Sequence, residues 1–190
     1  MRVVGGRHRG RRLVAPPGDT VRPTSDRARE ALFNILSHGE FAAAGSPFSD
    51  EKVLDAFAGT GALGIEALSR GAARAAFIET DRAALSGLRH NLAALDEEDS
   101  ADIISGNATR PPRAPFASAV AFLDPPYRSG LAAPALTALA AMGWLAPRAI
   151  AIVEIAADEE FSPPEGFTII DERKYGAARL VFLRRDGGKR

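Results

Sequence analysis

The chain has 190 residues, of which 46% are apolar and 25% charged, and this composition suits one α/β domain with a sizeable core. It contains no cysteine, which excludes disulfide bonds, thiolate metal sites and cysteine nucleophiles. The formal net charge is zero, no apolar run approaches the roughly 18 residues that span a bilayer, and the amino terminus lacks the apolar stretch of a secretory signal. We therefore expect a cytoplasmic protein.

The charge is distributed unevenly along the chain. The first 29 residues contain eight arginines and two aspartates, a net charge of +6, so the remainder sums to −6. The arginines are Arg2, Arg7, Arg9, Arg11, Arg12, Arg22, Arg27 and Arg29. This asymmetry indicates an anionic partner, with a solvated basic tail as the alternative. Because valines and a leucine alternate with the basic residues around Gly5-Gly6, we expect a short hairpin here.

A helix and then a connector are predicted after the basic stretch. The helix has suitable caps in Thr24, Ser25 and Asp26. Its apolar stripe, at helical spacing, consists of Ala28, Ala31, Leu32, Ile35 and Leu36. Residues 39–50 are rich in Gly, Ala, Ser and Pro and read as the connector. We therefore divide the chain into a basic hairpin with its helix, residues 1–38, and a second domain, residues 39–190.

Strand and helix patterns alternate from residue 52 onward. Strands are expected at 52–57, 74–79, 101–105, 118–123 and 149–155, and helices at 62–71, 82–95 and 131–145. This alternation predicts an α/β fold, a mostly parallel sheet with helices on both faces. The last two apolar segments, 167–176 and 178–185, have no helix between them, so we expect an antiparallel hairpin at the sheet edge.

The first strand of this sheet is followed by a glycine-rich loop. Gly59, Gly61 and Gly64 have the spacing G-x-G-x-x-G, and Glu79 ends the second strand about 20 residues later. This pattern is typical of a dinucleotide site in which Glu79 binds ribose hydroxyls, although it also fits a plain strand-to-helix turn and a solvated strand-end acid.

Asp55 argues against a dinucleotide, because it precedes the first glycine by four residues and would repel a pyrophosphate. A carboxylate there would instead attract an ammonium group, unless it only caps a turn. A cofactor with a nucleoside at one end and a cationic amino acid at the other fits both acids, and S-adenosylmethionine is such a molecule. Asn107, after the third strand, could bind the adenine edge or merely cap its loop.

The fourth strand ends in Asp124-Pro125-Pro126-Tyr127. An exocyclic amino group of a nucleobase is a poor nucleophile because its lone pair is delocalised into the ring. The Asp124 carboxylate and the Pro125 carbonyl could hold its hydrogens and turn the lone pair toward a methyl donor. Tyr127 offers a face on which an extruded base can stack, and the prolines fix the spacing of these groups. A proline turn without function is the alternative.

The motif Asp124-Pro125-Pro126-Tyr127 is similar to the (D/N)PP(Y/F) motif of class I S-adenosylmethionine-dependent amino methyltransferases. Nearly the whole chain resembles one branch of them, the bacterial RsmD-type guanine-N2 methyltransferases of small-subunit (16S) ribosomal RNA. The resembling pieces run in family order: RVVGGRHRGRRL, RPTSDRAREALFN, LDAFAGTGALGIEALSRGA, FIETDR, GNA, DPPYRSG and GWL.

This resemblance implies a Rossmann-like, seven-stranded sheet whose last two strands form the antiparallel edge, and methyl transfer to the 2-amino group of a guanine. The substrate would be ribosomal RNA, with an assembled small subunit as the expected form, and we expect a monomer. Residues 39–190 would be the methyltransferase domain and residues 1–38 the RNA-binding part. The cofactor site would comprise Asp55, Phe57, Gly59, Gly61, Glu79, Asn107 and Ala108. The RNA-binding residues would be Arg2, Arg7, Arg9, Arg11, Arg12 and Arg22.

Three other functions fit the sequence less well. A DNA adenine-N6 methyltransferase shares the acceptor motif but usually carries a large target-recognition insertion, for which this chain has no spare segment. A nicotinamide-dependent oxidoreductase would leave Asp55 and the Asp-Pro-Pro-Tyr motif unexplained, and a non-catalytic RNA-binding module would leave the glycine loop idle. A metal site is not expected, because His8, His38 and His90 fall in three different elements.

Overall fold

The computed structural model describes residues 1–14, 26–42 and 46–187. Its helices are α1 (Asp26–Leu36), α2 (Ala62–Ser69), α3 (Arg82–Ala94) and α4 (Ala132–Ala141), with short 3-10 turns η1 (Gly39–Ala42) and η2 (Glu98–Ser100). Its strands are β1 (Lys52–Ala56), β2 (Arg74–Glu79), β3 (Ala101–Ser105), β4 (Ser118–Leu123), β5 (Leu145–Ala156), β6 (Phe167–Tyr175) and β7 (Ala178–Arg185).

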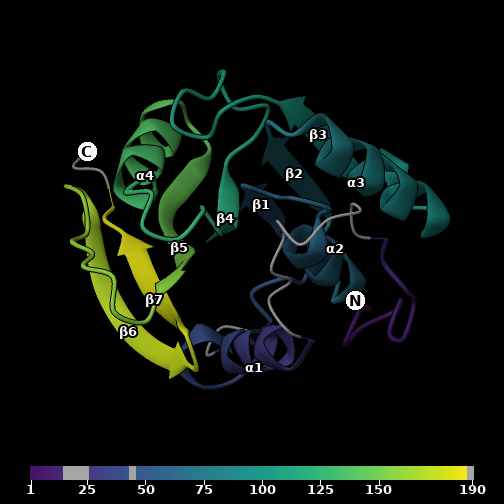
Figure 1. Cartoon of the computed structure of the whole chain (residues 1–190), viewed down its shortest axis with the longest axis horizontal. Helices are drawn as coiled ribbons and strands as arrows, with labels where there is room; N and C mark the ends of the chain where they lie inside the picture. Colours follow the sequence, from purple (N-terminus) through teal and green to yellow (C-terminus); the bar gives the residue numbers. More distant parts are fainter. Residues whose placement is uncertain (15–25, 43–45, 188–190) are drawn as a thin grey trace.

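The seven strands form one sheet in the order β3-β2-β1-β4-β5-β7-β6 (Figure 1). All neighbours among β3, β2, β1, β4 and β5 are parallel, whereas β7 is antiparallel to both β5 and β6. The predicted fold class is therefore confirmed, including the C-terminal hairpin. Because the chain runs outward from β1 in one direction and from β4 in the other, the switch point of the sheet lies between these two strands. Ligands of open α/β sheets bind beyond the carboxyl ends of the strands at such a point.

Two apolar layers cover the sheet. One contains buried residues of α1, α2 and α3, such as Phe33, Ile65 and Leu88, together with Phe77 and Phe122 of the sheet. The other contains the buried side of α4 and its neighbouring segments, and Figure 1 shows α4 on the opposite side of the sheet from α2. Side chains of a strand alternate between these layers, so the position of a residue in its strand decides which face it reaches.

The N-terminal residues pack on the helical layer. Val3 and Leu13 are buried in the same apolar cluster as α1 and α2. An antiparallel bridge joins Arg2 to Arg12, so the expected hairpin is present. Helix α1 begins at Asp26, and the predicted caps Thr24 and Ser25 lie outside the described residues.

The predicted helix 131–145 is too long at its carboxyl end. Helix α4 stops at Ala141, where Gly143 takes a positive φ of 83° and the Trp144 N–H donates to the Leu139 carbonyl, as in a glycine C-cap. The buried Trp144 ring then donates its own N–H to the Pro112 carbonyl, and β5 begins at the next residue. In the part of the chain that the structure describes, no helix is long and apolar enough to cross a membrane.

Candidate active site at the switch point

The glycine loop connects β1 to α2 at the switch point. Gly64 packs directly under the sheet, because a Cβ there would lie 2.3 Å from the Phe77 ring. Gly61 precedes α2 with a φ of 83° and is hemmed in by Leu88. Gly59 differs, because a Cβ built on it meets nothing within 4 Å. The loop is thus packed on its inner side and open at Gly59.

Asp55 lies at the end of β1, on the α2 side of the sheet. It is 1% exposed, and one of its carboxylate oxygens accepts a hydrogen bond from the Gly64 N–H at 2.8 Å. Burial raises the pKa of Asp55 to about 8, the nearby charge of Glu79 raises it further, and the backbone hydrogen bond opposes the rise. Asp55 therefore stabilises the loop and also favours a positive charge nearby.

Glu79, at the end of β2, is tied to the same loop. Its Oε2 accepts from the Gly59 N–H, and its Oε1 accepts from the N–H groups of Thr80 and Asp81, all at 2.7–2.8 Å. Phe57, which follows β1 with a φ of 60°, is half-buried against the α4 layer. The carboxylate of Glu79 is thus fixed by backbone donors at the edge of the open loop, and its Oε2, with one donor, can still accept from a ligand hydroxyl.

The loop after β3 contains Asn107 and Ala108. The Asn107 side-chain oxygen accepts from the Thr109 N–H and hydroxyl, both at 2.8 Å, so this asparagine does cap its own loop. Its exposed amide NH₂ group makes no further bond within the described residues. Ala108 is buried in the α4 layer. Asn107 can therefore cap its loop and also bind an adenine edge, since the cap engages only its side-chain oxygen and leaves the NH₂ group.

The Asp-Pro-Pro-Tyr motif follows β4. The Asp124 N–H is within 3.4 Å of the Ala56 carbonyl, which keeps the ends of β1 and β4 together. Burial, then the charge of Glu154 and then that of Asp55, raise the pKa of Asp124 well above its ordinary value. Tyr127 is half-buried, and Pro125 is buried. Within the described residues neither the Asp124 carboxyl nor the Pro125 carbonyl accepts a hydrogen bond, so both acceptors remain available.

Glu154 of β5 is a site residue that the sequence analysis missed. It is 8% exposed, and its Oε1 accepts from the Tyr127 hydroxyl at 2.8 Å. The residue after Tyr127 is also held by an acid that follows β5, because Glu159 accepts from the Arg128 N–H at 2.8 Å. A single acid inside the apolar run AIAIVEI was the available sequence signal, since buried strands rarely contain an unpaired carboxylate.

Strand alternation places these acids on one face. One residue in each of the four strands contacts the helical layer: Val53, Phe77, Val120 and Ile152. An acid follows each of them at an even spacing, which places its side chain on the same face of the sheet: Asp55, Glu79, Asp124 and Glu154. The carboxyl ends of β2, β1, β4 and β5 therefore present acids toward the same side. Among the described residues, no three side chains form a cluster that could hold a metal ion.

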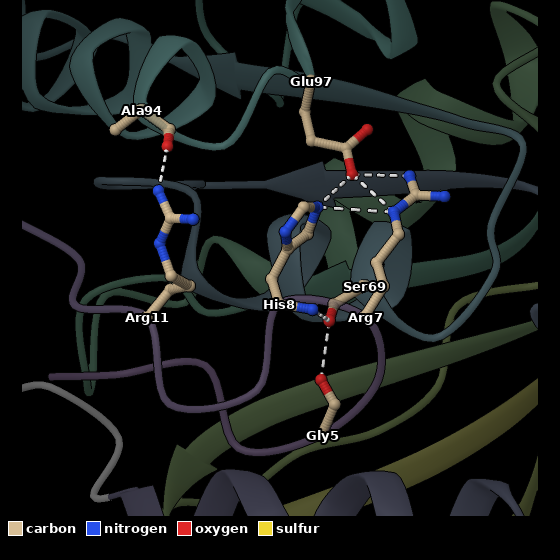
Figure 2. A network of polar contacts seen from close by, with 7 residues as sticks. All are labelled: Gly5, Arg7, His8, Arg11, Ser69, Ala94 and Glu97. Atoms are coloured by element: carbon tan, nitrogen blue, oxygen red, sulfur yellow. Dashed lines mark hydrogen bonds and ion pairs between the residues drawn. The ribbon is translucent and has the colours of Figure 1, made fainter.

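The arginines expected to bind RNA have different surroundings. Arg7 pairs with Glu97 and Arg11 donates to the Ala94 carbonyl (Figure 2), yet both remain exposed, as are Arg2, Arg9 and Arg12. Arg22 lies outside the described residues. Arg29 of α1 is fully buried beside Glu66, so its guanidinium has no access to a ligand.

Asn91 of α3 joins the N-terminal hairpin to the glycine loop. Its oxygen accepts from the Val14 N–H at 2.7 Å, and its NH₂ group donates to the carbonyls of Val14 and Thr60 at 3.1 and 3.0 Å. Asn91 is 1% exposed, so this contact is shielded from water. The hairpin is therefore attached beside the loop that forms the centre of the site.

The sheet order, the switch-point loop and the antiparallel β7 define a class I methyltransferase fold, and solved structures of similar shape agree. The structure of yhhF from Escherichia coli is 37% identical, covers 98% of both chains and superposes with a TM-score of 0.83. That of HI0767 from Haemophilus influenzae is 31% identical, also covers 98% of both chains and has a TM-score of 0.77.

The chain belongs to the family described as "Conserved hypothetical protein 95", whose model matches residues 1–184. A curated relative from Escherichia coli, "Ribosomal RNA small subunit methyltransferase D", is 42% identical over 81% of this chain and 74% of its own length. The protein of the same name from Haemophilus influenzae is 35% identical over 93% of this chain and 89% of its own. The predicted resemblance to the RsmD-type family is therefore confirmed.

Proposed function

We propose that this protein transfers the methyl group of S-adenosylmethionine to the exocyclic 2-amino group of a guanine in small-subunit (16S) ribosomal RNA. The observation that carries the proposal is the position of Asp124 at the switch point, close to Asp55, where its carboxyl accepts no hydrogen bond from the described residues. The names of the curated relatives support ribosomal RNA as the substrate.

The residues at the switch point fit S-adenosylmethionine chemically. Two carboxyls with raised pKa values, the buried Asp55 and the half-buried Asp124, favour a ligand that brings positive charge. Glu79 is held by three backbone N–H groups at the loop edge and can accept from ribose hydroxyls. Phe57, Gly59, Gly61, Asn107 and Ala108 complete the proposed cofactor site. When bound there, the cofactor supplies an electrophilic methyl group on a sulfonium.

The Asp-Pro-Pro-Tyr motif would position the acceptor base. The Asp124 carboxyl and the Pro125 carbonyl accept the hydrogens of the amino group, so its lone pair is directed away from the ring plane. Pro126 keeps the turn rigid. The Tyr127 ring stacks on the base, and Glu154 fixes that ring through its hydroxyl. As the new N–C bond forms, one amino hydrogen leaves as a proton, for which Asp124 is the nearest base in this motif.

The remaining features concern the substrate as a whole. We propose that residues 1–38 contribute to RNA binding, through exposed arginines such as Arg9 and Arg12, and that residues 39–190 carry out the reaction. A monomer acting in the cytoplasm on the assembled small subunit completes the proposal. The attachment of Val14 beside the glycine loop supports a path for RNA from the hairpin to the site.

The test is methyl transfer from labelled S-adenosylmethionine to small-subunit RNA, offered naked and as assembled subunits. We expect label in the RNA with the wild-type protein and a loss of most of it with Asp124→Ala. Calorimetry should detect binding of S-adenosylmethionine but not of a nicotinamide dinucleotide. Binding of the dinucleotide alone, or transfer to duplex DNA in place of RNA, would overturn the proposal.

A further inference from the structure

Residues 1–14, called the arm below, are docked on the protein in one defined position. Within the arm, the Val3 N–H donates to the Arg11 carbonyl at 2.9 Å and the Gly10 N–H to the Val3 carbonyl at 2.8 Å. Gly6 has a φ of 72°, and a Cβ there would fall 1.9 Å from the Ser69 carbonyl oxygen, so only glycine fits against the end of α2. The arm is thus a fixed part of the surface.

A single buried carboxylate holds the tip of the arm (Figure 2). Arg7 donates to Glu97 Oε1 through Nη2 at 2.5 Å and through Nε at 2.8 Å, and His8 Nε2 lies 2.6 Å from the same oxygen. The Glu97 side chain is only 4% exposed. Burial alone would raise the pKa of Glu97, but the hydrogen bonds from His8 and Arg7 outweigh it and leave the pKa below its ordinary value. Glu97 is therefore an ionised anchor.

Further contacts attach the arm to the ends of α2 and α3. The Ser69 hydroxyl donates to the Gly5 carbonyl at 2.6 Å and accepts from the His8 N–H at 2.9 Å. Arg11 donates to the Ala94 carbonyl at the carboxyl end of α3, a favourable place for a cation. Figure 2 shows Arg7 and Arg11 both pointing toward the protein rather than away from it.

Arg9 and Arg12 contrast with these two residues. All four arginines are exposed, but neither Arg9 nor Arg12 makes a side-chain hydrogen bond or ion pair with the part of the chain that the structure describes. No acid lies within the arm itself. Their positive charge is therefore presented to solvent on a support that docking has already made rigid, which reduces the entropy lost when an anion binds.

We infer that the arginines of the arm have two separate tasks, so that Arg7 and Arg11 hold the arm in place while Arg9 and Arg12 bind phosphates of the RNA substrate. Glu97 is then a positioning residue, which fixes the distance between these phosphate contacts and the active site. This inference rests on the proposed function, because it takes RNA as the anionic partner.

Deletion of the arm would be a poor test, because it would also remove Val3 and Leu13 from the core and take away the Val14 partner of Asn91. Two double variants with equal loss of charge are better. Arg9→Gln/Arg12→Gln removes the proposed phosphate contacts, and Arg7→Gln/Arg11→Gln removes the anchors. For each, the dissociation constant for a small-subunit RNA fragment is measured between 50 and 200 mM salt, alongside thermal unfolding.

Two phosphate contacts to single-stranded RNA should contribute roughly 1.4 to the slope of log affinity against log salt. The Arg9/Arg12 variant should therefore lose about that much slope and keep its unfolding temperature. The Arg7/Arg11 variant should unfold at a lower temperature and keep the slope to within about 0.5. Equal slopes for the wild type and the Arg9/Arg12 variant, or equal losses of slope in both variants, would overturn the inference.

Glu97→Gln tests the positioning role separately. It should raise the KM for RNA several-fold, leave kcat and the cofactor dissociation constant unchanged, and speed hydrogen exchange of arm amides such as those of Val3 and Arg7. An unchanged KM with faster exchange would contradict the positioning role. These readouts are independent of which base is methylated, so a wrong base in the proposed function would leave them intact.

Discussion

At the residue scale, Asp124 carries the largest expected effect on the reaction. Replacing it with alanine should lower kcat by roughly 10²–10³, the usual cost of losing one transition-state partner, because the carboxyl acts as the amino group becomes tetrahedral. The cofactor dissociation constant should change far less. Single-turnover rates and calorimetry separate these two quantities.

Asparagine is the matched control at this position, since the related motif admits either Asp or Asn. Asp124→Asn keeps an acceptor oxygen in place and should retain much more activity than Asp124→Ala. Equal, near-wild-type rates for both variants would show that the side chain takes no part in the reaction.

Asp55 should make cofactor binding depend on pH. Its pKa of about 8 in the free protein means that it is mostly protonated at pH 7. A cationic ligand favours the carboxylate and lowers that pKa, so binding releases a proton and affinity rises from pH 6 toward pH 8. Calorimetry in buffers of different ionisation enthalpy measures this proton, and Asp55→Asn should abolish its release. Uptake of a proton by the wild type would contradict the assignment.

The candidate site residues that could be predicted from the sequence lie at the ends of strands. Asp55 and Asp124 directly mark the carboxyl ends of β1 and β4, where the parallel topology brings ligands. Glu97 and Asn91 could not be found in this way, because their partners lie about 90 and 77 residues away and no local pattern marks such contacts. The contacts of Arg7 with Glu97 and of Arg11 with the Ala94 carbonyl were equally hidden, because charge alone does not tell which way a side chain points.

At the element scale, the ends of β4 and β5 form one unit through the hydrogen bond from Tyr127 to Glu154. Tyr127→Phe removes this bond and should lower kcat/KM for RNA by up to roughly 1.5–3 kcal/mol, mainly through KM, because the ring is less well placed. Glu154→Gln keeps an acceptor and should leave KM near the wild-type value. By removing a negative charge, it should also lower the pKa of Asp124, which shifts the pH profile of kcat toward lower pH.

A double variant decides whether the two residues act together. Tyr127→Phe/Glu154→Ala should be no more impaired in KM than the worse single variant, since one contact is lost in each case. Strictly additive effects in steady-state kinetics would mean that Tyr127 is positioned by other contacts.

Element boundaries were predictable where one signal dominated. The Gly176 turn between β6 and β7 was correctly located, and β2 and β3 have their predicted bounds. The helix predicted at 131–145 was too long because the apolar run continues through Trp144. Helix α4 ends earlier because Gly143 has a positive φ and the Trp144 ring donates to the Pro112 carbonyl. Tertiary packing, which periodicity does not contain, decided this boundary.

At the scale of the whole molecule, alternating strands and helices were enough to predict the sheet and its edge hairpin. The docking of the arm beside the glycine loop was not predictable, because it depends on buried contacts of Asn91 with distant backbone and of Glu97 with distant side chains. The identity of the methylated base also cannot be derived from strand order, since the same pair of acceptors suits guanine N2 and adenine N6.

The most direct measurement is mass spectrometry of nucleosides from small-subunit RNA after incubation with the protein and S-adenosylmethionine carrying a labelled methyl group. We predict labelled N2-methylguanosine with the wild type and at least a hundredfold less with Asp124→Ala, following the expected rate loss. Labelled N6-methyladenosine, or no labelled nucleoside under conditions where the cofactor binds, would contradict the proposed reaction.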